Sequence, residues 1–210
     1  MYDLPYYKDT DEQVVRDFIE KYPFAFLTGC DQQGKPVATQ VPVIMEMRDD
    51  RMILSSHIMK KTDHHRAFSQ NPNVLAVFTG PHCYVSARWY SDPQVPSTWN
   101  YMSVHARGSI RFLDDPGLED MLQKTSLYFE NGDPGSPTVF KNLSRELRQK
   151  LMKAIVAFEV EVDEVDHVFK LSQDRDADSY RNIMDQLMEQ DGDSRAIAAE
   201  MKRRMPSGDC

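Results

Sequence analysis

The chain has 210 residues, of which 40% are hydrophobic and 28% charged, and its net charge at pH 7 is -8. A chain of this length buries enough apolar surface to fold without disulfides or structural metals. The acidic balance argues against direct nucleic-acid binding, which depends on basic side chains that contact phosphates. A sum over the whole chain does not exclude a local basic patch.

The cysteines and the N-terminal residues favour a protein of the reducing cytoplasm. The chain has three cysteines, Cys30, Cys83 and Cys210. An odd number of cysteines that lie far apart in the sequence does not indicate a disulfide framework. Residues Met1 to Pro5 lack the basic and apolar regions of a secretory signal, and no apolar run reaches the length of a membrane span. We therefore expect a cytoplasmic protein without membrane contact.

The first predicted element is a helix. Thr10 to Gln13 matches a capping box, with Thr10 at the cap position and Gln13 three residues later. The apolar residues that follow share one helix face: Val14, Val15, Phe18 and Ile19. Pro23 then marks the end of this helix.

Alternating polarity and turn residues predict a mainly antiparallel sheet in the rest of the chain. The predicted strands cover residues 24–30, 37–43, 52–56, 74–78, 84–87, 104–112 and 156–162. Turns are expected at 31–34, 49–50 and 79–81, and a proline-broken loop at 91–97. Further helices are expected at 60–70, from a cap at Asp115, at 143–151, and in two pieces after Ala177 that break near Gly192. The expected class is α+β, with six or seven antiparallel strands in a small barrel.

The end of the strand at 52–56 has the composition of an anion site. Ser55, Ser56 and His57 follow an apolar stretch, and Lys60 and Lys61 stand at the start of the next predicted helix. Hydroxyls, lysines and a helix N-terminus together favour a phosphate or another anion. A polar strand end followed by a solvated helix cap explains the same residues equally well.

The aromatic residues between 89 and 101 are the second candidate. Trp89, Tyr90, Trp99 and Tyr101 fall in or beside the proline-broken loop, near Asn100. Aromatic side chains on loops often cover a planar ligand or a partner surface. The alternative is a packed loop that caps the barrel.

The histidines favour no metal site. Five of them fall within one half of the chain, but His64 and His65 are adjacent and would point in different directions on a helix. We expect surface or anion-contacting histidines rather than metal ligands.

Three spaced motifs resemble those of the PaiB-like proteins. The first runs from Gly80 to Tyr90 and includes Gly-Pro-His and Trp-Tyr, and it departs from the usual pattern at Ala87 and Arg88. The second runs from Pro96 to Tyr101, with an additional Ser97, and is followed by Val104, His105 and Gly108. The third is Phe169 to Gln173, which contains Lys-Leu-Ser-Gln.

The resemblance implies an FMN-binding split barrel of six to seven antiparallel strands, with flanking helices and a helical C-terminal tail. The barrel domain would cover residues 1–173, and 174–210 would be a helical extension packed on it or on a partner subunit. The family is usually homodimeric with flavin at the subunit interface, and it is named for negative transcriptional regulation. It is similar in fold to flavin reductases and pyridoxamine phosphate oxidases.

The resemblance also implies where FMN would bind. The phosphate would lie at the end of the third strand and the following helix, which here means Ser55, Ser56, His57, Lys60 and Lys61. The isoalloxazine would run along residues 38–41, which include Thr39, Gln40 and Val41. Trp99, Asn100 and His105 would close the pocket, from the same or the partner subunit.

Three functional hypotheses follow. The first is a flavin-dependent oxidoreductase or flavin carrier, in which His82 or His105 is the only candidate general acid. The second is a transcriptional regulator that acts through DNA or a protein partner; Lys202 to Arg204 is the one compact basic run in its tail. The third is a cofactor-free scaffold with a degenerate pocket.

Overall fold

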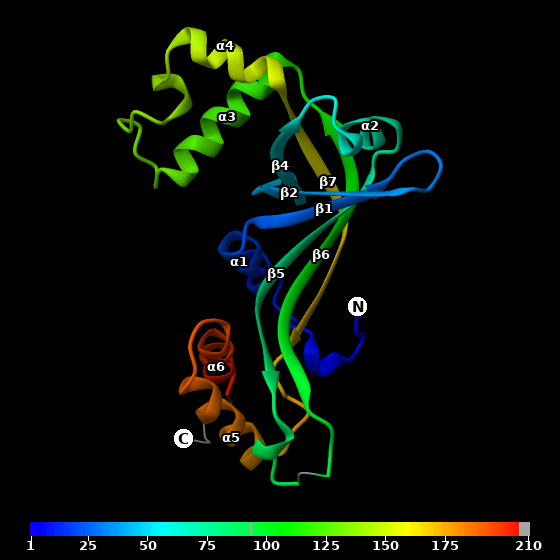
Figure 1. The fold of residues 1–210 in the computed structure, drawn as a ribbon, viewed down its shortest axis with the longest axis vertical. Helices are drawn as coiled ribbons and strands as arrows, with labels where there is room; N and C mark the ends of the chain where they lie inside the picture. The colour runs from blue at the N-terminus through cyan, green and yellow to red at the C-terminus, as the bar shows by residue number, and fades with distance from the viewer. Residues whose placement is uncertain (93, 206–210) are drawn as a thin grey trace. The chain divides into compact units, whose positions relative to one another are not determined.

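The computed structural model describes residues 1–92 and 94–205. Pro93 of the predicted loop, and the end of the predicted extension with Cys210, lie outside the described residues. The described residues form seven strands, six α-helices and three short 3-10 helices (Figure 1). The strands are β1 Phe24–Cys30, β2 Pro36–Pro42, β3 Ile44–Arg48, β4 Arg51–Met59, β5 Asn73–Val85, β6 Thr98–Phe112 and β7 Ile155–Lys170. The α-helices are α1 Glu12–Lys21, α2 Asp63–Gln70, α3 Asp115–Phe129, α4 Arg145–Ala154, α5 Ala177–Met188 and α6 Asp193–Arg203.

The chain divides into two compact units. The first contains residues 1–18, 79–104 and the described part of 166–210; the second contains residues 19–78 and 105–165. Strands β5, β6 and β7 contribute residues to both units. No helix among the described residues is long and apolar enough to cross a membrane.

The second unit is built on a sheet that curls. The strand order is β2-β1-β5-β6-β7-β4-β3, and the pairs β1–β2, β1–β5, β3–β4 and β4–β7 are antiparallel. The first and last strands of this order, β2 and β3, are consecutive in the chain and separated only by Val43. Because one residue cannot bridge a flat seven-stranded sheet, the sheet must bend into a partial barrel. The predicted α+β class and antiparallel barrel are thus confirmed.

Side chains alternate along these strands as a half-buried barrel requires. Val41, Leu54 and Ile58 are buried on the inner side, and Phe24 and Phe26 are exposed on the outer side of β1. On the outside of β4 and β7, α3 packs through a small cluster of Leu118, Met121 and Ala157. The barrel interior therefore comes from the inward residues of several strands.

The first unit has its own core around α5 and α6, which pack against each other (Figure 1). Ile183, Leu187 and Ile197 from the two helices are completely buried. Phe18 and Phe169 lie together, with ring centroids 5.2 Å apart.

Several sequence-based element predictions need correction. The strand at 44–48 was missed, because its partly buried residues do not alternate clearly. The predicted turn at 79–81 and separate strand at 84–87 are wrong, since β5 continues from Asn73 to Val85. Within β5 the buried positions change from even numbers up to Phe78 to odd numbers from Pro81. Gly80 and Pro81 therefore mark a shift of the strand's faces, as a bulge produces, instead of a chain reversal.

Two predicted helix caps are displaced by one residue. The helix α1 begins at Glu12, and the Asp11 carboxylate, in place of Thr10, accepts from the backbone N–H of Gln13 at 2.8 Å. Helix α3 is capped by Asp114, which accepts from the Gly117 N–H at 2.9 Å, so the predicted cap Asp115 is already helical. An aspartate directly before the first helical residue competes effectively for the cap position.

Candidate functional site

The junction between β4 and α2 contains the five residues that were predicted to bind the phosphate. Ser56 is 1% exposed, and its hydroxyl donates to the Pro42 carbonyl at 2.6 Å, which ties β4 to the end of β2. Ser55 and His57 alternate to the opposite, outer face of the strand. The buried Ser55 hydroxyl and the His57 Nδ1 have no hydrogen-bond partner among the described residues. Burial lowers the pKa of His57, so its ring is neutral at pH 7.

Cations gather where β4 ends. Lys60 is half-buried, and its Nζ lies 3.4 Å from the Met152 carbonyl oxygen; Lys61 is exposed and adopts a positive φ of 68°. Thr62 caps α2 by accepting from the His65 N–H at 3.2 Å. Arg66 donates to the Lys61 carbonyl at 2.7 Å, which brings a third cation to the same turn.

The pKa of His65 is lowered, first by burial and then by the positive charges of His64, Lys60 and Arg66. Burial is the first cause of this shift, and the neighbouring positive charges add to it because like charges disfavour protonation. An anion placed here would be attracted by the same charges.

Strand β2 lies beside β4, with the predicted ring-contact residues on it. Thr39 is half-buried, Gln40 is exposed and Val41 is buried. Gln40 pairs with Phe26 of β1 across the sheet, and both point outward. The outer faces of β2 and β4 in one unit therefore hold Gln40, Ser55 and His57.

The predicted pocket-closing residues have different environments. Trp99 lies on strand β6 and not in a loop, is half-exposed, and contacts the rings of His82 and Tyr84 in the first unit. Asn100 is completely buried there; its Oδ1 accepts from the Ser172 hydroxyl at 3.1 Å. The side chain of Asn100 is thus committed to the core. His105 is half-buried on β6 in the second unit.

The remaining aromatic residues divide between core and edge. Tyr90 is 6% exposed, and the Arg175 guanidinium stacks on its ring at 4.5 Å. For Tyr90 the alternative of a packed loop describes the structure better than a ligand wall. Trp89 ends a short 3-10 helix, 87–89, and is half-buried.

Sequence reasoning missed a charged cavity of about 240 Å³ beside Ser55 in the second unit. Glu159 is only 7% exposed and is paired with Arg48 at 2.7 Å and with Arg111. Glu46 also pairs with Arg48 at 2.7 Å, and this hydrogen bond is the main reason that the pKa of Glu46 is lowered. No sequence motif predicts this network of ion pairs, because its charged residues come from separate strands. Among the described residues, no group of three or more potential ligands could hold a metal ion.

A curled antiparallel seven-stranded sheet with flanking helices defines a split-barrel protein. Solved structures with this fold include the flavocytochrome Anf3 of Azotobacter vinelandii, which is 18% identical with a TM-score of 0.56 over 81% of this chain and 72% of that one. The FAD and heme binding protein of Mycobacterium smegmatis is also 18% identical, with a TM-score of 0.54 over 82% of this chain and 78% of that one.

Residues 1–164 match the family model described as "Putative FMN-binding domain". The "Protease synthase and sporulation protein PAI 2" of Bacillus subtilis (strain 168) is 32% identical over 205 residues, which cover 96% of both chains. The chain therefore belongs to this family, the PaiB-like proteins.

Proposed function

We propose that this protein binds FMN on the outer face of the barrel. The phosphate would lie against Lys60, Lys61 and the start of α2. The observation that carries the proposal is the concentration of cations at the β4–α2 junction, Lys60, Lys61 and Arg66, in a chain whose net charge is -8. The family match, which includes this junction, supports it.

The neighbouring groups fit a planar, polar ligand. The unpartnered Ser55 hydroxyl and His57 Nδ1 are polar atoms that a ligand could satisfy. The Ser56 bond to Pro42 keeps β2 alongside β4, so one ring could contact both strands through Gln40 and His57. Thr39 and Val41 would support the strand from its inner side. Because the Asn100 side chain is already hydrogen-bonded in the core of the first unit, we propose no flavin contact for it.

FMN, when bound, would supply redox chemistry, while the chain supplies binding and orientation. His57, neutral at pH 7, would offer a hydrogen bond without adding charge next to the ring. A flavin-dependent oxidoreductase is the reaction class that this arrangement supports best. The flavin and heme ligands in the names of the two structural neighbours agree with a redox cofactor at this fold.

The test is a titration of purified protein with FMN and with riboflavin, followed by flavin fluorescence and visible absorption. We expect FMN to bind more tightly than riboflavin, which lacks the phosphate. Lys61→Ala should weaken FMN binding by about tenfold, the usual size of one charge-assisted contact, and leave riboflavin binding unchanged. Lys150→Ala, at an exposed position of α4, is the matched control. Equal FMN affinities for the parent and Lys61→Ala would show that the phosphate site is misplaced.

A regulatory role is the second candidate, because the name of the Bacillus relative refers to protease synthesis and sporulation rather than to a reaction. The basic run in the tail offers little for DNA, since Arg203 pairs with Glu200 at 2.9 Å and Arg204 with Asp9 at 2.7 Å. We expect no gel shift that weakens steeply with salt, which is the behaviour of a phosphate-contacting protein. A steep salt dependence would favour direct DNA binding instead.

A further inference from the structure

The first unit contains a cavity of about 320 Å³ beside the loop that follows β7. Its lining includes Arg175, Arg181 and Arg204, with Tyr180 and Ala177, and none of its lining residues is acidic. A volume of this size lies at the lower end of the range for small-molecule sites. Three guanidinium groups around one cavity, in an acidic chain, call for an explanation.

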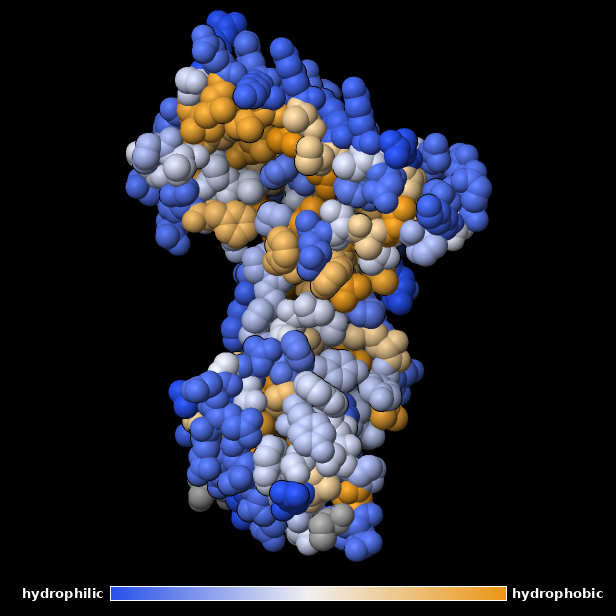
Figure 2. Space-filling model, viewed as in Figure 1, coloured by the Kyte–Doolittle hydropathy of each residue, from blue (hydrophilic) through white to orange (hydrophobic). Residues whose placement is uncertain are grey.

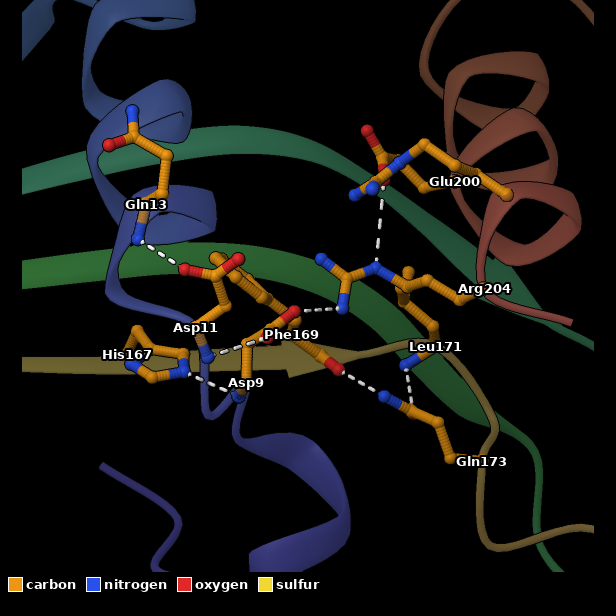
Figure 3. A network of polar contacts seen from close by, with 10 residues as sticks. Asp9, Asp11, Gln13, His167, Phe169, Leu171, Gln173, Glu200 and Arg204 are labelled. Carbon is orange, nitrogen blue, oxygen red and sulfur yellow. Dashed lines mark hydrogen bonds and ion pairs between the residues drawn. The ribbon is translucent and has the colours of Figure 1, made fainter. Parts of the chain in front are cut away.

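Two of the three arginines already have carboxylate partners. Arg204 pairs with Asp9 at 2.7 Å, and its Nε lies 3.6 Å from Glu200 (Figure 3). Arg181 pairs with Asp178, one turn earlier on α5, at 3.3 Å. Structural ion pairing is therefore a sufficient explanation for these two side chains.

Arg175 differs from both. No carboxylate of the described residues lies within salt-bridge distance of it. Its buried Nε, like that of Arg204, has no hydrogen-bond partner among the described residues. Its guanidinium stacks on the ring of Tyr90 at 4.5 Å, and Tyr90 is itself buried. The ring contact restricts the movement of the guanidinium, and a guanidinium can bind carboxylates and phosphates through two parallel bonds. A partly buried guanidinium without a carboxylate partner costs free energy that an anionic ligand would recover.

The Lys-Leu-Ser-Gln motif builds the turn that positions Arg175. Ser172 is 1% exposed with a positive φ of 63°, and its carbonyl accepts from the Arg175 N–H at 3.1 Å. The Gln173 side chain closes the turn: its amide donates to the Phe169 carbonyl at 2.6 Å and its oxygen accepts from the Leu171 N–H at 2.6 Å (Figure 3). The motif thus has a clear local purpose, which is to hold the chain rigidly just before the arginine.

We propose that this cavity binds a small organic anion, a carboxylate or phosphate attached to an apolar body. The Arg175 fork would hold the anionic group, and Arg181 would add positive charge at the cavity wall. Ala177, Tyr180 and Arg181 are spaced as one face of α5, so the methyl group and the phenol ring offer the apolar body a surface next to the charge. The site shares no residue with the proposed flavin site and does not depend on it.

The experiment is isothermal titration of the full chain with phenyl phosphate and with benzoate, which separate the two kinds of anion, and with benzyl alcohol as the neutral probe. At least one anion should bind and the alcohol should not. Arg175→Gln should weaken binding by about tenfold or more. Arg175→Lys should have an intermediate effect, because lysine retains the charge but loses the planar fork. Arg145→Gln, on the exposed side of α4, should bind as the parent does.

Absence of binding by both anions, or equal affinity of Arg175→Gln and the parent, would overturn the proposal. If Arg175→Gln fails the check of its thermal transition and circular dichroism, Arg181→Gln takes its place and should also weaken binding. Competition between phenyl phosphate and FMN would show one shared site and so refute a separate pocket. A protein that binds no flavin but binds these anions would leave this inference intact while the flavin proposal falls.

Discussion

Gly108 lies on strand β6 directly against the backbone of β7. A Cβ atom at this position would lie 2.0 Å from the Glu161 carbonyl oxygen and 2.9 Å from the Val162 Cα. Both neighbours are backbone atoms of a paired strand, so neither moves without disturbing the sheet. The glycine is thus required by space, which explains its place in the motif that follows His105.

We predict that Gly108→Ala destabilises the protein by about 2 to 4 kcal/mol, the range for forced backbone displacement in a packed region. Chemical denaturation, followed by circular dichroism, measures the change. Gly135→Ala is the control, since its added Cβ meets only the Asp133 side chain at 3.2 Å in an exposed loop. Destabilisation of similar size in both variants would contradict the argument.

At the residue scale, local sequence pattern predicted some site features and missed others for a physical reason. Ser55 to Lys61 are contiguous, so a strand end with hydroxyls and lysines is visible in the sequence itself. The environments of Asn100 and Tyr90 depend on Ser172 and Arg175, more than 70 residues later. A local sequence pattern does not show which distant residues pair in the fold. The sequence therefore could not distinguish a buried core amide, as Asn100 has, from an amide that contacts a ligand.

Helix α5 depends on its cap, and the cap is linked to a distant segment. The Asp176 carboxylate accepts from the backbone N–H of Ser179 at 2.9 Å and from its hydroxyl at 2.6 Å. It also accepts from the Ser91 hydroxyl at 2.9 Å. These bonds, those of Ser179 first, lower the pKa of Asp176 to about 2.

Because the folded pKa is below the unfolded value, the carboxylate contributes stability above pH 4, and this contribution is lost as the pH falls from about 4 to about 2. We predict that Asp176→Asn is less stable than the parent at pH 7 and that the difference shrinks over this range. Thermal melts at a series of pH values measure it. Asp185→Asn, at an exposed position of the same helix, should match the parent throughout. A constant difference from pH 7 to pH 2 would refute the link to ionisation.

At the scale of elements, an apolar run predicted the first strand, and alternating polarity predicted several later ones, because both patterns are visible in the local sequence. β1 was predicted with its observed bounds, Phe24–Cys30, and the break of the tail near Gly192 lies between α5 and α6. β5 was divided in two because Gly80 and Pro81 are turn formers in isolation. In the fold, β5 pairs with β1 as far as Val77, and residues on both sides of Gly80 and Pro81 are buried. These contacts keep the chain extended through the two turn formers.

For the whole molecule, the outward face of β1 raises the question of what covers it. Phe24 is 56% exposed and Phe26 is 42% exposed, although β1 lies between β2 and β5 in the sheet. A second apolar surface is visible in Figure 2 over α3 and α4, and the exposed apolar side chains of these helices include Phe129 and Leu147. Large exposed apolar groups on an internal strand favour an interface. We propose a homodimer that buries the β1 face and so covers a flavin lying along β2.

The proposed dimer gives a direct prediction. Phe26→Lys should convert a dimer into a monomer, because a lysine on the interface would have to be desolvated without a partner. Multi-angle light scattering after gel filtration measures the mass of each variant. FMN affinity should fall in parallel, since Gln40, the cross-strand neighbour of Phe26, is a proposed ring contact. Tyr128→Lys, at a 47% exposed position of α3, distinguishes the two apolar surfaces and should remain dimeric. A dimeric Phe26→Lys together with a monomeric Tyr128→Lys would move the interface to the helices, and would leave the flavin site on β2 open to solvent.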